Sequence, residues 1–266
     1  MKINLLGWVS LRDDGVGVPL VSRQARTLLA LLALEPGRSL SADYLVDQLW
    51  SDAELGNARN ALQANITRLR RALRAGLGTE RGDALLQTVE GGYRLALRPE
   101  EVDVFAFVGE LREAEMLGRG DPVRATHLID TALARWQGSA LDGVSDAPAL
   151  RAERVRLTER RTTALELQAG LRLEAGDVRS AIADLTHLVE MHHERENLNE
   201  LLMMALYLDG RQTEALDVFR RVRNRLRNEL GVDPSHRLNH LHQAILSHDP
   251  KLSRRFHRDA PVGAVA

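Results

Sequence analysis

The chain has 266 residues and a formal net charge of −1, so neither its length nor its overall charge singles out a class of partner. Hydrophobic residues make up 44% of it, which excludes a disordered polymer, and the absence of cysteine excludes disulfides, thiolate chemistry and cysteine-based zinc sites. The apolar run after Met1 is too short for a signal peptide, and no stretch approaches the ~18 apolar residues that a membrane span needs. We expect a cytoplasmic protein of about two domains with no membrane partner.

The front of the chain combines strand and helix signals. Short apolar alternation around the Asp13-Asp14-Gly15 turn predicts a small sheet over residues 3–18. Ser22 is a good N-cap for a first helix that stops at Pro36-Gly37, and Ser41 caps a second helix that runs to Trp50.

A hairpin closes this front region. The sequence LLQTVEGGYRLAL alternates on both sides of Gly91-Gly92, which predicts two strands joined by this glycine pair with positive backbone angles. Pro99-Glu100-Glu101 then marks a boundary.

A basic helix lies between these signals. Residues 57–74 carry five arginines and no acid, within a front region (1–98) whose 13 basic and 10 acidic residues give +3; the remaining 23 basic and 27 acidic residues give −4. Its apolar positions follow the spacing of one buried stripe: Ala58, Leu62, Ile66, Leu69 and Leu73. The opposite face carries Asn60, Gln63, Ala64, Thr67, Arg68, Arg71 and Arg74.

Such a face has the chemistry to read DNA. In the major groove arginine can bond guanine, asparagine or glutamine can bond adenine, and a small side chain can meet a thymine methyl. The alternative is a merely solvated charged face. The order of helix, short helix, basic helix and glycine hairpin favours DNA binding, because it is the layout of a winged helix.

The second half of the chain reads as amphipathic helices. Three helix starts superimpose, because each glycine is followed at the same spacings by small and then large apolar residues; the three sets are Gly120, Ala125, Ile129, Ala132; Gly176, Ala181, Leu185, Leu188; and Gly210, Ala215, Phe219, Val222. The last two glycines are 34 residues apart, the tetratricopeptide period, and an insertion interrupts the array before them. The predicted fold class is mainly α: a winged helix-turn-helix with small sheets (1–98), an all-α tetratricopeptide-like domain (99–248) and a flexible tail (249–266).

Residues 3–98 resemble the effector domain of OmpR/PhoB-type response regulators, on the segments DQLW, ITRLRRAL and QTVEGGYRL. The resemblance implies DNA contacts from Asn60, Ala64, Thr67, Arg68 and Arg70, with Arg71 nearby. It also implies phosphate contacts from Thr88 and the Trp50 indole. Glu90 stands where that family often has a basic wing residue, which argues against insertion of a basic wing into the minor groove.

Residues 103–247 resemble the bacterial transcriptional activator domain, on ALARWQGSAL, LLMMALYLDGRQTEALDVFRRVRNRL and NELGVDPSHRLNHLHQAIL. A winged helix followed by this domain resembles the Streptomyces antibiotic regulatory protein family, with no receiver domain expected. The resemblance implies an activator of a secondary-metabolite gene cluster that binds promoter direct repeats as a pair and recruits RNA polymerase holoenzyme. By analogy, the loop Ser51–Gly56 is a candidate polymerase contact.

Other readings remain open. One is a protein-interaction adaptor whose winged helix does not bind DNA, and another is a helical domain that binds a small effector between its repeats. His236, His240 and His242 lack a completing ligand, so we expect no metal, no cofactor and no enzymatic activity. We also expect self-association through the helical domain, and packing of the segment Asp103–Phe107 against the DNA-binding half.

Overall fold

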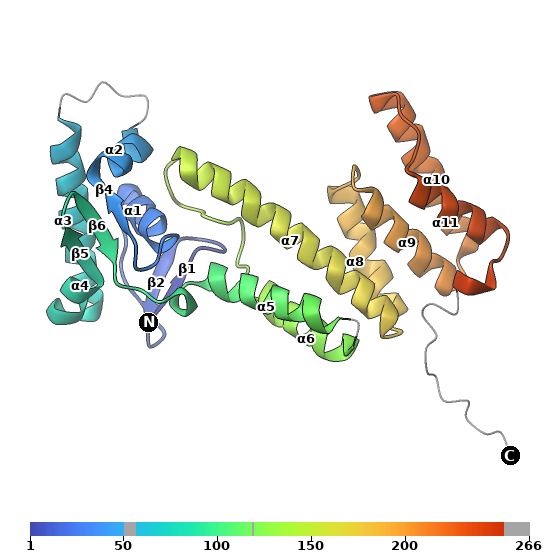
Figure 1. The fold of residues 1–266 in the computed structure, drawn as a ribbon, viewed down its shortest axis with the longest axis horizontal. Helices are drawn as coiled ribbons and strands as arrows, with labels where there is room; N and C mark the ends of the chain where they lie inside the picture. Colours follow the sequence, from blue (N-terminus) through green and yellow to red (C-terminus); the bar gives the residue numbers. More distant parts are fainter. Residues whose placement is uncertain (51–56, 119, 253–266) are drawn as a thin grey trace, which may run out of the picture. The chain divides into compact units, whose positions relative to one another are not determined.

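The computed structural model describes residues 1–50, 57–118 and 120–252, which belong to two compact units (Figure 1). One unit contains residues 1–112 and 131–162; the other contains residues 113–130 and those from 163 onward. Within the described ranges, no helix combines the length and apolar character that crossing a membrane requires.

Two small antiparallel sheets organise the first unit. The first has the order β1 (Lys2–Asn4), β2 (Ser10–Asp13), β3 (Val16–Gly17), and the second has the order β4 (Ser39–Ser41), β6 (Gly92–Leu95), β5 (Leu86–Val89). The β2–β3 turn uses Asp14 and Gly15, whose φ angles are 47° and 84°. A short polar residue and a glycine suit this left-handed turn.

Four helices follow or connect these strands: α1 (Arg23–Ala33), α2 (Ala42–Trp50), α3 (Ala58–Leu77) and α4 (Thr79–Leu85). The two predicted caps are confirmed, because Ser22 Oγ accepts from the Ala25 N–H at 3.4 Å and Ser41 Oγ accepts from the Tyr44 N–H at 3.1 Å. Helix α4 was not predicted from the sequence. It packs against α3 and leads directly into β5.

The predicted turn at Gly91-Gly92 is wrong by one residue. Val89 pairs with Gly92 across the hairpin, so the two-residue turn is Glu90-Gly91 and Gly92 is the first residue of β6. Gly91 has the positive φ that was expected, at 72°. Gly92 is needed for a different reason: a Cβ there would collide with the carbonyl oxygen of Leu40 on β4.

Residues from the middle of the chain complete the first unit. The Leu141 N–H donates to the carbonyl of Leu5 at 2.8 Å, and Arg26 Nε donates to the carbonyl of Gly143 at 2.8 Å. At the start of α7 (Pro148–Glu174), the Ala149 N–H donates to the side-chain oxygen of Gln48 on α2 at 2.7 Å. These bonds explain why residues 131–162 share a compact unit with the winged helix. The domain boundary expected after residue 98 stays a prediction.

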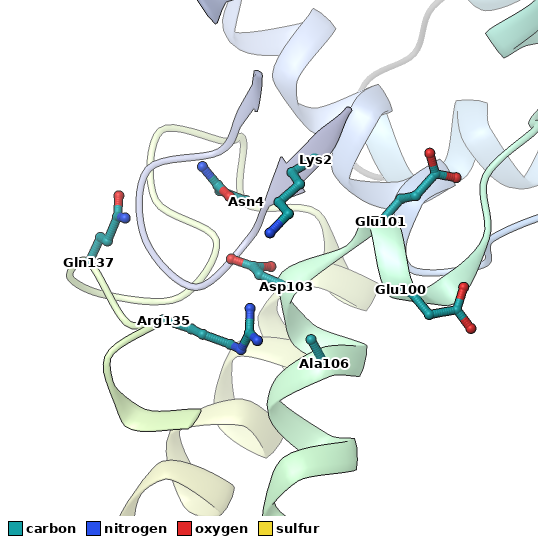
Figure 2. Close-up of a pocket in the computed structure, with 8 residues that line it drawn as sticks. All are labelled: Lys2, Asn4, Glu100, Glu101, Asp103, Ala106, Arg135 and Gln137. Atoms are coloured by element: carbon teal, nitrogen blue, oxygen red, sulfur yellow. The ribbon is translucent and has the colours of Figure 1, made fainter. Parts of the chain in front are cut away.

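Asp103 ties helix α5 (Asp103–Leu117) to the first strand. Helix α5 follows the 3₁₀ turn η1 (Pro99–Glu101). The Asp103 carboxylate accepts from the N–H groups of Leu5 and Leu6 at 2.8 and 3.0 Å. This carboxylate lines a polar pocket of about 130 Å³. Figure 2 shows it among side chains that include those of Lys2 and Arg135. Burial raises the pKa of Asp103, although the backbone donors act in the opposite direction. The packing expected around Asp103–Phe107 is therefore present within this unit.

The second unit is helical. Its elements are α6 (Pro122–Leu133, shared with the first unit), the later part of α7, α8 (Val178–Met191), α9 (Glu196–Leu208), α10 (Gln212–Arg225), the π-helical turn η2 (Leu226–Leu230) and α11 (His236–Leu246). The small and large apolar residues that superimpose in the sequence are all buried, in α6, α8 and α10. The predicted fold class is confirmed.

Candidate nucleic-acid interface

Helix α3 separates an apolar underside from a polar face. Leu62, Ile66, Leu69 and Leu73 are at most 2% exposed, and the helix packs on α1 and α2. The opposite face is exposed at every predicted position: Asn60, Gln63, Ala64, Thr67, Arg68, Arg71 and Arg74. Burying four leucine-type side chains fixes the rotation of the helix about its axis. The division into two faces is confirmed, and contact with DNA stays a prediction.

A buried asparagine, which the sequence reasoning missed, positions one arginine of this face. Asn65 is 4% exposed; its side-chain Nδ2 donates to the carbonyl of Ala61 and its Oδ1 accepts from Arg68 Nη1, both at 3.0 Å. The available signal was a polar residue one position before Ile66, inside the apolar stripe. Arg71 is exposed and has no hydrogen bond or ion pair with another described residue.

Arg70 points away from the exposed face and toward the hairpin. This half-buried side chain donates from Nη2 to Thr88 Oγ1 at 3.1 Å and to the carbonyl of Leu86 at 3.4 Å. Because the Thr88 hydroxyl accepts from arginine, its own hydrogen remains available for a second partner. The two predicted contact residues Arg70 and Thr88 therefore lie together and bridge α3 to β5.

Two other arginines of α3 are held by carboxylates from neighbouring helices. Arg74 forms a two-pronged pair with Asp83 of α4, Nε to Oδ1 at 2.7 Å and Nη2 to Oδ2 at 2.9 Å. This pair lowers the pKa of Asp83 and raises that of Arg74. At the other end of α3, Arg59 Nη2 lies 2.8 Å from an oxygen of Asp43 on α2. The sequence pattern missed both carboxylates, because they come from other elements.

A hollow of about 300 Å³ lies where the starts of α2 and α3 meet the hairpin. Its lining mixes polar and apolar groups; the residues are Ala42, Asp43, Arg59, Leu62, Gln63, Thr88, Val89, Gly91, Gly92 and Tyr93. Figure 1 shows α3 running beside the β5–β6 hairpin in this unit. The starts of α2 and α3 and the hairpin thus border one shared hollow.

Three further features were predicted from the sequence: Trp50, the loop Ser51–Gly56 and Glu90. Trp50 is half-buried at the last position of α2. The loop Ser51–Gly56 that follows it lies outside the described residues. Glu90 is exposed in the hairpin turn, which places a negative charge at the tip of the wing.

The described residues contain no group of three or more histidine, aspartate or glutamate side chains arranged to hold a metal ion. The rings of His236 and His240 lie 6.5 Å apart. His242 instead stacks on Phe219, with 3.9 Å between ring centres.

Comparison with known proteins places the same two halves among regulators. Residues 18–95 match the family model "Transcriptional regulatory protein, C terminal", and residues 102–246 match the "Bacterial transcriptional activator domain". The chain is 40% identical over 253 residues to the transcriptional regulator RedD of Streptomyces coelicolor, covering 95% of this chain and 72% of that one. It is 36% identical over 258 residues to the regulatory protein DnrI of Streptomyces peucetius, covering 96% and 95%.

A solved structure has the same architecture. Mycobacterium tuberculosis EmbR, in complex with a low-affinity phosphopeptide, superimposes with a TM-score of 0.87 at 28% identity, covering 96% of this chain and 67% of that one.

Proposed function

Because the chain belongs to the Streptomyces antibiotic regulatory protein family of DNA-binding transcriptional activators, we propose that it switches on a secondary-metabolite gene cluster. It is a regulator and not an enzyme. In this proposal it binds direct repeats in a promoter as a head-to-tail pair and recruits RNA polymerase holoenzyme. It acts in the cytoplasm, where the bacterial chromosome lies, and Ser51–Gly56 is the candidate polymerase contact.

The exposed face of α3 is the observation that carries the proposal. An α-helix of this size enters the major groove of B-form DNA. Asn60 and Gln63 have the donor and acceptor pair that matches adenine, and Arg68 and Arg71 have the fork that matches guanine. Ala64 and Thr67 offer small surfaces to a thymine methyl. We assign sequence readout to these six side chains.

We assign the sugar-phosphate backbone to the hairpin side of the same surface. The Thr88 hydroxyl, oriented by Arg70 at 3.1 Å, has a hydrogen to donate to a phosphate oxygen. The Trp50 indole N–H is the second phosphate donor. Arg70 then acts by positioning Thr88, because its own guanidinium is directed to β5. Arg74 lies at the rim of the surface.

Footprinting on DNA upstream of neighbouring genes tests the proposal. Wild-type protein is expected to protect direct repeats separated by whole helical turns, and Arg68→Ala with Arg71→Ala is expected to lose this protection at moderate salt. Sedimentation with the protected duplex is expected to give two chains per duplex. Protection by the double variant equal to that of wild type would contradict the assignment of α3. A lack of binding to any duplex would favour the protein-interaction adaptor instead.

A further inference from the structure

One carboxylate lies against two arginines of α3. Asp83 lies on α4 and takes both prongs of Arg74, at 2.7 and 2.9 Å, while Arg70 Nε lies 4.0 Å from the same carboxylate. A two-pronged bond to a carboxylate uses the same guanidinium donors as a two-pronged bond to a phosphate. Asp83 occupies the Nε and Nη2 edge of the Arg74 guanidinium, so a phosphate is left with the remaining Nη1 and Nη2 hydrogens, close beside a carboxylate of like charge.

The pair is open to exchange. The side chains of Arg74 and Asp83 are 47% and 41% exposed, so solvent and a docking anion both reach them. If Arg74 turned to a phosphate, Asp83 would be left without its principal partner beside a polyanion. The freed Asp83 carboxylate and the DNA phosphates carry like charges and repel each other, most strongly at low salt. The exchange is therefore opposed twice: by the loss of the pair and by repulsion of the freed carboxylate.

We propose that Asp83 is a specificity-determining residue that restrains sequence-independent binding to DNA. This inference rests on the proposed function, since it assumes that α3 faces a duplex. Binding without sequence recognition depends almost entirely on phosphate contacts. Asp83 withholds one such contact, through Arg74, and leaves the readout residues Arg68 and Arg71 free of any carboxylate among the described residues.

The restraint acts unequally on the two kinds of complex. In a sequence-independent complex the helix has no fixed register, so a released Arg74 can reach a phosphate in many arrangements. In a sequence-specific complex the bonds from α3 to the bases fix the register, and Arg74 gains only if a phosphate lies at that one position. Release of Arg74 is thus expected to strengthen random binding more than specific binding.

Asp83→Asn in the full chain tests this inference. The probes are a random-sequence duplex and a duplex that wild-type protein selects from a random pool, titrated by fluorescence anisotropy over a range of salt. We expect Asp83→Asn to raise affinity for the random duplex about 1.5- to 5-fold at low salt, as for loss of an exposed ion pair. The plot of log K against log salt should steepen by about 0.9, the value of one added phosphate contact. Affinity for the selected duplex should rise by a smaller factor.

Asp13→Asn is the matched control. Asp13 on β2 forms a two-pronged pair with Arg81 of α4, at 2.6 and 2.9 Å, and also lies 3.6 Å from the N-terminal amine, so its substitution removes the same charge but frees no arginine of α3. Asp83→Glu keeps the charge and is expected to behave as wild type. Arg74→Lys keeps both charges but breaks the fork, and should give a smaller rise in the same direction even if Asp83→Asn does not fold.

The outcomes separate the two proposals. Equal rises for Asp83→Asn and Asp13→Asn would reduce the effect to net charge and overturn the inference. Wild-type selection of a duplex, with random-duplex affinity unchanged in Asp83→Asn and Arg74→Lys, would overturn the inference alone. A wild-type protein that selects and binds no duplex would overturn the proposed function and the inference together.

Discussion

Helices α3 and α10 carry similar arginine runs but neutralise them differently. Residues 57–74 and residues 218–228 each contain five arginines and no acid. On α10 and η2 the counter-charges lie close in sequence: Arg220 pairs with Asp217 at 2.6 Å, Arg225 with Glu229 at 3.8 Å, and Arg227 with Asp233 at 2.7 Å. On α3 they come from α2 and α4, through Asp43 and Asp83.

The difference teaches that a count of arginines does not define a binding surface. Ion pairs between residues three or four apart follow from helix geometry alone. Pairs between separate helices depend on the fold and leave the middle of α3, with Arg68 and Arg71, without a carboxylate among the described residues. On α10, Arg223 lies over the ring of Phe219, 6.0 Å from its centre.

The largest expected effect is on DNA affinity, and it is tested by removing two arginines from α3 in one variant and two from α10 in another. Arg68→Ala with Arg71→Ala is expected to weaken binding to the selected duplex by about 30-fold or more, because two contacts of about 1–3 kcal/mol each are lost. Arg221→Ala with Arg223→Ala removes the same charge from α10 and is expected to change the affinity by less than about twofold. Anisotropy titration at fixed salt measures both. A comparable loss in both variants would show that α10 also contacts DNA, and would contradict the functional difference between the two helices.

An intermediate effect is expected from a substitution in the hairpin beside α3. Gly92→Ala places a methyl group against the carbonyl oxygen of Leu40, so β4 and β6 must separate. We expect a loss of about 1–3 kcal/mol in the free energy of unfolding, as for an overpacked core position, measured by urea denaturation. Duplex affinity should fall as well, since Thr88 lies on the paired strand β5. Gly17→Ala, where an added Cβ meets nothing within 4 Å, is the control; equal stability of the two variants would refute the close approach.

The smallest expected effect concerns the surroundings of α10. Burial, aided by Arg223 and Arg220, lowers the pKa of His242 from its usual value of 6.5. His242 therefore binds a proton less tightly in the folded chain than in the unfolded chain. Unfolding takes up a proton at pH values between the lowered pKa and about 6.5. It follows that the free energy of unfolding rises with pH between the lowered pKa and about 6.5, and falls on acidification.

Urea denaturation at a series of pH values checks this. His242→Gln should flatten the slope below neutrality, whereas His240→Gln on the same helix serves as the matched substitution. Retention of the full slope in His242→Gln would assign it to another group. Duplex affinity at constant pH should be the same in both variants, which would keep the role of α10 separate from that of α3.

Much of the fold followed from periodicity. The leucine stripe of α3, the caps Ser22 and Ser41, and the buried positions of α6, α8 and α10 were all predictable, because they depend on residues within a few turns of one another. Gly92 was misread as a turn residue, since its requirement comes from Leu40, far away in sequence. Helix α4 gave no periodic signal over its seven residues.

The sequence by itself determined which side chains α3 exposes, because a helix with a buried leucine stripe has only one remaining face. Only the tertiary structure decided what each of them meets. It paired Arg74 with Asp83, turned Arg70 to Thr88 and joined residues 131–162 to the winged helix through bonds such as Leu141 to Leu5. Those partners are separated by between 9 and 136 residues along the chain, and no local periodicity carries information over such distances.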